Sequence, residues 1–213
     1  MLRLAKHKND IVILDIINDE FNIIEENDGG KEIYNSASNY LDIINKTNLE
    51  LVNNYLICER RCGDVHYTGF LEERWFMPSP DVRRLVDVDI IYSFFRLFQC
   101  INITEEKSFL GIICDLHKVR LESKKSDTEL NFDIIDKYKT HLEIIFPFFR
   151  KKSNCLTYSY FLAKRLIHHG MAAVVVVGIR TQPFYSHAWV EIDGKVINDE
   201  CDIRDKLTVI LVI

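Results

Sequence analysis

The chain has 213 residues, of which 47% are hydrophobic and 28% are charged, and its formal net charge is −5 at pH 7. This composition is typical of a globular protein with one large domain or two small ones. The acidic balance argues against a general affinity for nucleic acid or for an anionic membrane. The apolar run near the N-terminus is short and interrupted by Asp15, unlike a secretory signal. No segment has the roughly 18 uninterrupted apolar residues of a membrane span, so we expect a cytoplasmic protein.

The six cysteines are expected to be reduced thiols, because disulfides are rare in the cytoplasm. Cys58 and Cys62 are four residues apart, but no second pair of Cys or His residues completes a four-ligand zinc site. No glycine-rich phosphate loop of the P-loop type is present. The sequence therefore indicates neither a metal nor a cofactor, and it leaves a requirement for ATP open.

The first part of the chain predicts a hairpin followed by helices. Residues 11–17 and 21–26 are apolar and β-rich, and a short turn separates them. Apolar residues recur at helical spacing over residues 31–45. A second helix is predicted from Thr47, whose side chain would form a capping box with Glu50. This order predicts a small winged-helix-like unit.

The clearest break in the chain is "PSPD" at residues 78–81, because each proline restricts its own backbone and that of the preceding residue. We therefore predict two domains, residues 1–80 and 81–213. The second domain is predicted to begin with three helical segments, which are listed as residues 81–101, 108–123 and 133–149.

The last 60 or so residues predict an α+β fold. A helix is expected over residues 154–169 and strands at "AAVVVVGIR", "SHAWVEI" and "KVIND". The first of these strands is apolar at nearly every position, which indicates burial on both faces of a sheet.

Cys155 is predicted to lie in the first turn of a helix capped by Ser153 or Asn154. Unsatisfied N–H groups and the helix dipole stabilise a thiolate there, and Lys151 and Lys152 add positive charge. A buried cysteine of the core is the commoner fate of such a residue, and taken alone Cys155 favours that interpretation.

His187 strengthens the case for a nucleophile, because a catalytic cysteine needs a base and the base needs an orienting group. A three-residue hairpin loop ending in Gly194 would pair Glu191 with Lys195 and set Asp199 directly opposite His187. We predict this register. A strand histidine with a purely structural hydrogen bond is the alternative.

The competing register has a two-residue turn, Asp193-Gly194. It shifts the pairing by one residue and places Glu200 opposite His187 instead. Because a slip of one residue exchanges the two faces of a strand, we predict that only the three-residue loop brings Cys155, His187 and Asp199 together as a triad.

Five stretches of the chain resemble the B proteins of lasso-peptide biosynthesis, and most closely the microcin J type. They are "IVILDIIND", "FLEERWFMPSPD", "SNCLTYSY", "IRTQPFYSHAWVE" and "VINDECDIRDKL". The resemblance covers nearly the whole chain. It implies a transglutaminase-like, papain-related cysteine peptidase whose catalytic triad falls on Cys155, His187 and Asp199.

The resemblance also implies a substrate and a partner. The substrate is a ribosomal precursor peptide whose leader is removed, and the partner is a cyclase that resembles asparagine synthetase and joins the freed amine to an acidic side chain. Residues 1–80 would recognise the leader as an added β-strand. Oxyanion stabilisation is expected from the backbone N–H groups of Cys155 and Leu156 at the helix start, with Gln182 as a candidate side-chain donor.

Two other functions stay open. A transglutaminase-like acyltransferase would use the same triad but resolve the thioester with an amine. A non-catalytic scaffold that delivers the precursor to the cyclase would need none of the three residues. The intact set Cys155, His187 and Asp199 argues against the scaffold.

Overall fold

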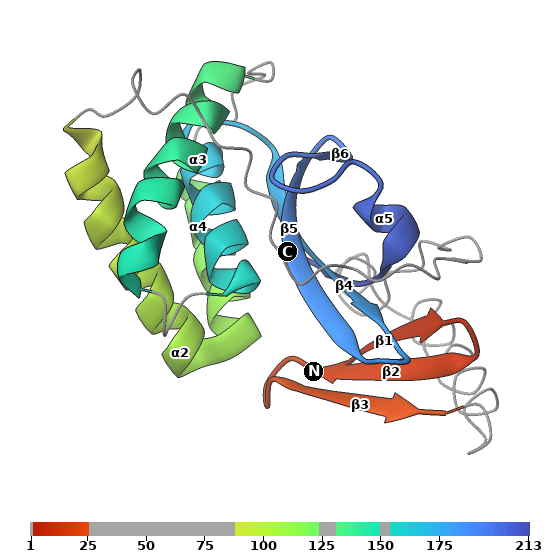
Figure 1. Cartoon of the computed structure of the whole chain (residues 1–213). Coiled ribbons are helices and arrows are strands. Elements are labelled where there is room, and N and C mark those ends of the chain that lie inside the picture. Colours follow the sequence, from red (N-terminus) through yellow and green to blue (C-terminus); the bar gives the residue numbers. More distant parts are fainter. Residues whose placement is uncertain (1, 26–87, 124–130, 150–153) are drawn as a thin grey trace. The chain divides into compact units, whose positions relative to one another are not determined.

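The computed structural model describes residues 2–25, 88–123, 131–149 and 154–213. These residues combine helices with two β-sheets, which fits the predicted α+β class (Figure 1). The helices predicted from residue 31 to beyond Thr47, the boundary at residues 78–81, and Cys58 and Cys62 lie outside the described residues. The winged-helix-like unit therefore stays a prediction.

Internal contacts divide the chain into two compact units. Strands β4 and β5 contribute residues to both. The first unit consists of Met1–Gly69, Val177–Ser186 and Arg204–Val212, and the second of Phe70–Val176, His187–Ile203 and Ile213.

The first sheet has three antiparallel strands in the order β1-β2-β3. They span Leu2–His7 (β1), Asp10–Asp15 (β2) and Glu20–Ile24 (β3). Strands β2 and β3 confirm the hairpin predicted from the apolar runs. Strand β1 was not predicted from the sequence.

The pattern of β1 explains why it escaped prediction. Its buried positions are Arg3, Ala5 and His7, whereas Leu2 is 48% exposed. Side chains alternate between the two faces of a strand, so a strand with polar residues on its inner face lacks the usual hydrophobic signal. The inward ring of His7 finds a partner far along the chain, because its Nδ1 lies 2.9 Å from Oγ1 of Thr208.

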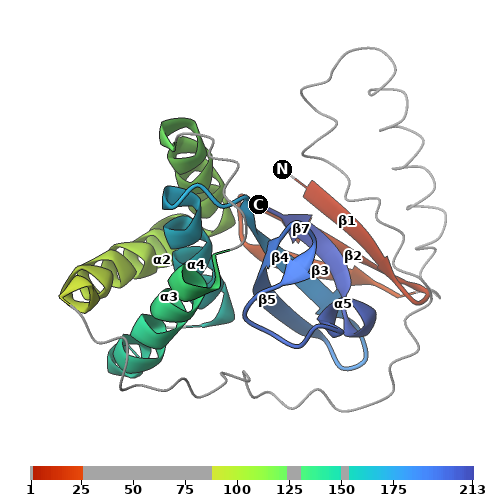
Figure 2. The same ribbon diagram turned by 90° about the horizontal axis from the view of Figure 1, so that it is seen from above.

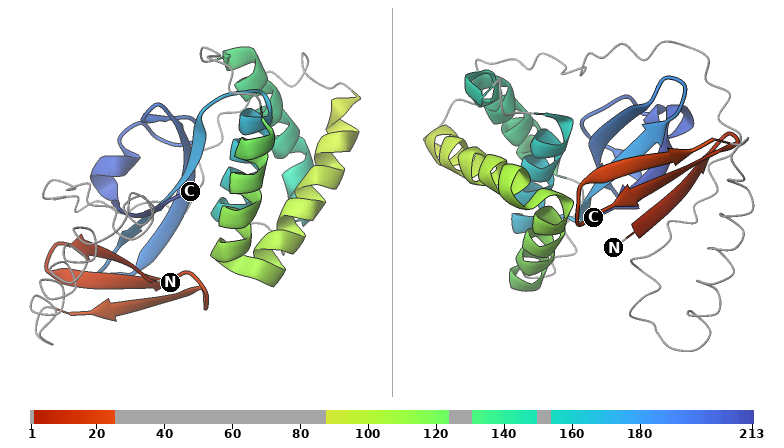
Figure 3. Two further views of the ribbon diagram at one scale, coloured as in Figure 1. Left: turned by 180° about the vertical axis from the view of Figure 1, so that it is seen from behind. Right: turned by 90° about the horizontal axis from the view of Figure 1, so that it is seen from below.

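The second unit contains a group of helices, α2, α3 and α4, that lie side by side (Figures 2 and 3). Helix α3 is capped by Asn131, whose side chain accepts a hydrogen bond from the backbone N–H of Ile134. The helices contribute fully buried apolar side chains to the core, among them Leu97, Ile101, Ile112, Leu116 and Leu142. The helices span Asp89–Glu122 (α2), Phe132–Ile145 (α3), followed by the 3₁₀ turn η3 (Phe146–Phe149), and Cys155–His168 (α4).

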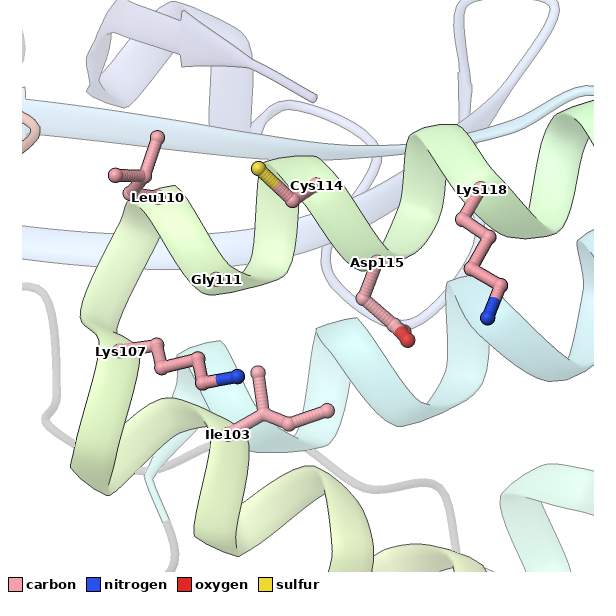
Figure 4. A pocket seen from close by; sticks show the side chains of 7 residues that line it. All are labelled: Ile103, Lys107, Leu110, Gly111, Cys114, Asp115 and Lys118. Atoms are coloured by element: carbon pink, nitrogen blue, oxygen red, sulfur yellow. The ribbon is translucent and has the colours of Figure 1, made fainter.

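Helix α2 corrects the prediction of two separate helices, because one helix of 34 residues runs through both segments. It changes direction between Lys107 and Leu110 (Figure 4). A Cβ added at Gly111 would come within 2.3 Å of the Cβ of Lys107. Glycine is therefore the residue that fits the inside of this bend.

The second sheet has the strand order β6-β5-β4-β7. Strand β4 is buried at almost every position, which confirms the prediction for the valine-rich segment. Strand β7 and the short helix α5 were not predicted. None of the helices in the described ranges has the length and hydropathy of a bilayer span. The elements span Ala173–Arg180 (β4), Tyr185–Ile192 (β5), Lys195–Val196 (β6), Ile203–Lys206 (α5) and Thr208–Val212 (β7).

Candidate functional site

Cys155 is the first residue of α4, as the sequence predicts. The backbone of Asn154 is extended, and its side-chain oxygen accepts a hydrogen bond of 2.9 Å from the N–H of Thr157. The first N–H groups of a helix have no carbonyl four residues back to bond. Those of Cys155 and Leu156 are therefore available at the helix start, where the dipole favours negative charge. Cys155 itself is partly exposed, unlike a core cysteine.

His187 and Asp199 are in direct contact. The Nε2 N–H of His187 donates to Oδ2 of Asp199 at 2.5 Å. Both side chains are well covered, with exposed fractions of 7% and 14%. The second carboxylate oxygen, Oδ1, accepts from the N–H of Glu200, which fixes the orientation of the carboxyl group. An imidazole that has Nε2 committed in this way presents Nδ1 for other chemistry.

The neighbours of His187 raise the pKa of its ring above the ordinary value. Burial alone lowers the pKa of His187, but the hydrogen bond to Asp199 and the hydrogen bond and charge of Cys155 outweigh it and raise the pKa to about 9. A protonated imidazole beside a thiol stabilises the thiolate, which is the nucleophilic form of cysteine. The site thus contains the three types of side chain that activation of a cysteine nucleophile requires.

The hairpin register predicted from the sequence is wrong. Ile192 pairs with Lys195 and Glu191 with Val196, so the turn is the two-residue Asp193-Gly194. Both turn residues have positive φ, 50° and 78°, which is the conformation of the tight turn preferred by an Asp-Gly pair. This local preference outweighs the charge pair between Glu191 and Lys195, which favours the longer loop.

Asp199 nevertheless contacts His187, because the strand pairing ends before Asp199 and the alternation of side chains does not extend to it. Strand β6 has only two residues, and the chain bends over residues 197–199. The regular alternation of strand faces therefore does not extend to Asp199. The expected contact between His187 and Asp199 is present, although the register proposed to produce it is not.

Leu156 and Gln182, which are expected to donate to the oxyanion, have different surroundings. Leu156 lies at the start of α4 beside Cys155, where its N–H has no intrahelical acceptor. The side chain of Gln182 donates through Nε2 to Oδ2 of Asp10 at 3.3 Å, within the first unit. An oxyanion role for either residue stays a prediction.

Trp189 is a buried structural residue next to the site. It is fully buried, its Nε1 donates to Oε1 of Glu191 at 2.7 Å, and its ring stacks on that of His187 with centroids 6.3 Å apart. The guanidinium of Arg180 lies over the ring of Tyr185, 5.5 Å from the ring centre.

Two polar residues beside the site were missed by the sequence reasoning. Oγ of Ser159 donates to the carbonyl of Ala188 at 2.9 Å, and Nδ2 of Asn198 lies 3.4 Å from the same Oγ. Ser159 follows Cys155 by one helical turn, and this i, i+4 spacing was the available signal. Asn198 gave no local signal beyond its place in the sequence before Asp199.

A cavity of about 520 Å³ lies at the bend of α2 rather than at Cys155 (Figure 4). Ile103 and Lys107 line it from the arm before the bend, and Asp115 and Lys118 from the arm after it. The carboxylate of Asp115 already pairs with Lys164 at 2.6 Å. Within the described ranges, no group of three or more His, Cys, Asp or Glu side chains is arranged to hold a metal ion.

Comparisons with known proteins identify the family of the chain. Residues 110–212 match the model of the transglutaminase-like superfamily. Over 97% of its length the chain is 37% identical to the Microcin J25-processing protein McjB of Escherichia coli, of which the match covers 96%. The chain belongs to the McjB family of lasso-peptide maturation proteins. No solved structure matches the chain at a significant level.

Membership of the McjB family confirms the resemblance drawn from the sequence motifs. The superfamily match begins in the second half of α2 and includes α3, α4 and the whole second sheet. Cys155, His187 and Asp199 all lie within the matched residues. The match therefore covers every element that carries the site.

Proposed function

We propose that this McjB-family protein is a cysteine peptidase that removes the leader from a ribosomal lasso-peptide precursor. The observation that carries the proposal is the hydrogen bond of His187 to Asp199 beside Cys155 at a helix start. A nucleophile, a base and an orienting carboxylate in this relation are what acyl transfer through a thioester needs. The name of the relative, a microcin-processing protein, supports the same reaction class.

In the mechanism, the two ring nitrogens of His187 have different roles. Because Nε2 of His187 is bonded to Asp199, Nδ1 holds the proton lost by Cys155. The thiolate attacks the scissile carbonyl, and the N–H groups of Cys155 and Leu156 stabilise the oxyanion. His187 then passes its proton to the leaving amine as the peptide bond breaks. Water, deprotonated by the same ring, hydrolyses the thioester and restores the thiol.

The freed core amine is the substrate of the next step. We place a partner cyclase there, one that resembles asparagine synthetase and joins this amine to an Asp or Glu side chain. Leader recognition is assigned to residues 1–80, with the leader added as a β-strand. In the described part of the chain, β3 is an edge strand of the first sheet, and such an edge is able to accept a further strand. The protein is expected to act in the cytoplasm.

The test is leader cleavage by the purified full-length protein. Cys155→Ala should abolish cleavage, measured by mass spectrometry of the products, while titration still detects binding of the leader peptide. Cys114→Ala is the matched control, because Cys114 is an exposed thiol on α2 and should be dispensable. Cleavage by purified Cys155→Ala would contradict the proposal, and loss of leader binding in the same variant would contradict the separation of binding from chemistry.

A second function is favoured by the superfamily match alone. A transglutaminase-like acyltransferase would resolve the same thioester with an amine instead of water. The two reactions differ in product mass, because hydrolysis adds one water and transfer does not. A leader fragment that carries an added amine would therefore move the assignment to acyl transfer.

A further inference from the structure

The hairpin that carries His187 ends its backbone ladder in an irregular way. Ile197 donates its N–H to the carbonyl of Val190 at 2.9 Å. In a hydrogen-bonded pair of a regular antiparallel ladder, each residue donates to and accepts from the other. The N–H of Val190 would therefore donate to the carbonyl of Ile197. Instead, it donates to Oδ1 of Asn198 at 2.6 Å. The Asn198 side chain thus takes the place of a backbone carbonyl.

The carbonyl that is displaced finds another partner. Nζ of Lys139, on helix α3, lies 3.3 Å from the oxygen of Ile197. The backbone is therefore released from β5 at this point without leaving either group of the interrupted pair unbonded. The chain is free to bend directly after Ile197.

The end of the strand pairing at Ile197 determines the position of Asp199. The observed pairs, Ile192 with Lys195 and Glu191 with Val196, would if continued set Asp199 opposite Ala188 and Glu200 opposite His187. Successive side chains of a strand point to opposite faces, so a regular ladder would turn Asp199 away from His187. The bend at Asn198 allows the observed contact of 2.5 Å instead.

The side-chain nitrogen of Asn198 contacts helix α4, which carries Cys155. Nδ2 of Asn198 donates to Oγ of Ser159 at 3.4 Å, and that Oγ donates to the carbonyl of Ala188 at 2.9 Å. Ser159 is fully buried and lies one helical turn after Cys155. The chain of bonds therefore joins a neighbour of His187, a neighbour of Asp199 and the helix face of Cys155.

We infer that Asn198, together with Ser159, is a positioning residue that directs Asp199 onto His187 and holds the strand of His187 against the helix of Cys155. It touches none of the reacting atoms and acts through Asp199. Its effect on turnover rests on the proposed peptidase function, whereas its effect on the His187 ring does not.

The first test compares turnover of the full-length protein. Asn198→Leu keeps the approximate volume and removes both side-chain bonds, and a small misplacement of a catalytic group is able to lower kcat by about 10²-fold. We expect a fall in kcat for leader cleavage with little change in KM. Asn198→Asp keeps the acceptor for the Val190 N–H and should recover part of the loss. In an Asp199→Asn background, Asn198→Leu should add little, because both changes remove the same function.

The second test needs no substrate. Titratable groups that face His187 are Cys155 from α4 and Asp199 from the bend. Burial lowers the pKa of His187 and the Asp199 contact raises it, so losing that contact should move the pKa down from about 9. Nitrogen NMR of histidine-labelled protein measures this pKa, with His187→Gln to assign the signal.

Ser159→Ala and Ser93→Ala form a matched pair. Both hydroxyls are fully buried and hydrogen-bonded, but the partner of Ser93 is Nδ1 of His141, between α2 and α3. Both variants should lose stability, and only Ser159→Ala should lower kcat and the pKa of His187. This pair and Asn198→Asp also carry the test if Asn198→Leu does not fold.

The outcomes separate two hypotheses. An additive loss in the Asn198→Leu, Asp199→Asn double variant, or an unchanged pKa of His187 in Asn198→Leu, would overturn the positioning role. A lowered pKa in a protein whose wild-type form does not cleave precursor would overturn the peptidase assignment and support the positioning of Asp199.

Discussion

The raised pKa of His187 has a consequence for pH dependence. Burial lowers its pKa, but Asp199 and Cys155 raise it to about 9, above the ordinary value of 6.5. A group whose pKa is raised by folding stabilises the folded state fully below the ordinary value and loses this contribution as the pH rises through the higher one. The positive charge of the His187 ring is lost over the same range.

We therefore predict that kcat/KM for leader cleavage falls as the pH rises through about 9. This parameter reports ionisations of the free enzyme. In Asp199→Asn the alkaline limb should move to lower pH, because the hydrogen bond that raises the pKa is weakened while burial remains. A pH profile of initial rates measures both curves, and coincident alkaline limbs would contradict the role given to Asp199.

The three site residues should differ in the cost of their loss. Removing the orienting carboxylate of a serine triad costs about 10⁴-fold in rate. A cysteine and histidine form an ion pair without the third residue, so Asp199→Asn should slow cleavage by less than Cys155→Ala does. His187→Ala should approach the effect of Cys155→Ala, since no other base replaces it. Single-turnover rates on one precursor give this order.

Asp193→Asn is the control for the carboxylate series. It removes an exposed acid six residues from Asp199 and keeps a residue that tolerates positive φ in the turn. Cleavage should be unchanged. An equal loss in Asp193→Asn and Asp199→Asn would mean that net charge, rather than the contact with His187, is responsible.

At the scale of elements, two glycines are required for different reasons. Gly194 has a φ of 78° with nothing within 4 Å of an added Cβ, so its requirement is purely conformational. Gly111 lies in a helix, and an added Cβ would come within 2.3 Å of the Lys107 Cβ. The first glycine sets the turn of the hairpin, and the second permits the bend of α2.

Gly111→Ala should therefore destabilise the protein, although at an exposed helix position alanine is normally more stable than glycine by about 1 kcal/mol. Overpacking costs about 1–3 kcal/mol, and the adjacent backbone of α2 leaves little room to relax. Urea unfolding measures the change, with Cys114→Ala as a control on the same helix. A rise in stability for Gly111→Ala would show that the bend does not need glycine.

At the scale of the whole molecule, the ends of the chain meet in one compact unit. Strands β1 to β3 share it with residues 177–186 and 204–212. His7 on β1 bonds Thr208 on β7, and Asp10 bonds Gln182. The predicted unit of residues 1–80 lacks both later segments, so leader binding is better measured on full-length Cys155→Ala than on a fragment.

Thr208→Val tests this long-range link. It keeps the shape of the side chain but leaves Nδ1 of buried His7 without the hydroxyl 2.9 Å away, and an unsatisfied buried group costs about 1–3 kcal/mol. Thr140→Val is the control, because its buried hydroxyl bonds a carbonyl one turn back within α3. Adding His7→Leu to Thr208→Val should recover stability, since replacing both partners is nearly neutral. Equal losses in the two threonine variants would contradict the link.

The sequence by itself determined the features that depend on near neighbours. The start of α4 at Cys155 follows from a cap that bonds three residues on, and the burial of β4 follows from its unbroken apolar run. The family motifs also pointed to Cys155, His187 and Asp199 without any coordinates. Such features are encoded within a few positions, so local chemistry suffices to predict them.

Only the tertiary structure decided how Asp199 meets His187. The preference of Asp193-Gly194 for a tight turn selected a register in which a regular ladder would point Asp199 away from His187. The side chain of Asn198 takes the place of a backbone acceptor, and the ladder ends before Asp199. Strand β1 was hidden for a related reason, because its inner face carries polar residues whose partners lie elsewhere in the chain. Hydrogen bonds between residues far apart in sequence leave no periodic pattern, and they become visible only when the chain has folded.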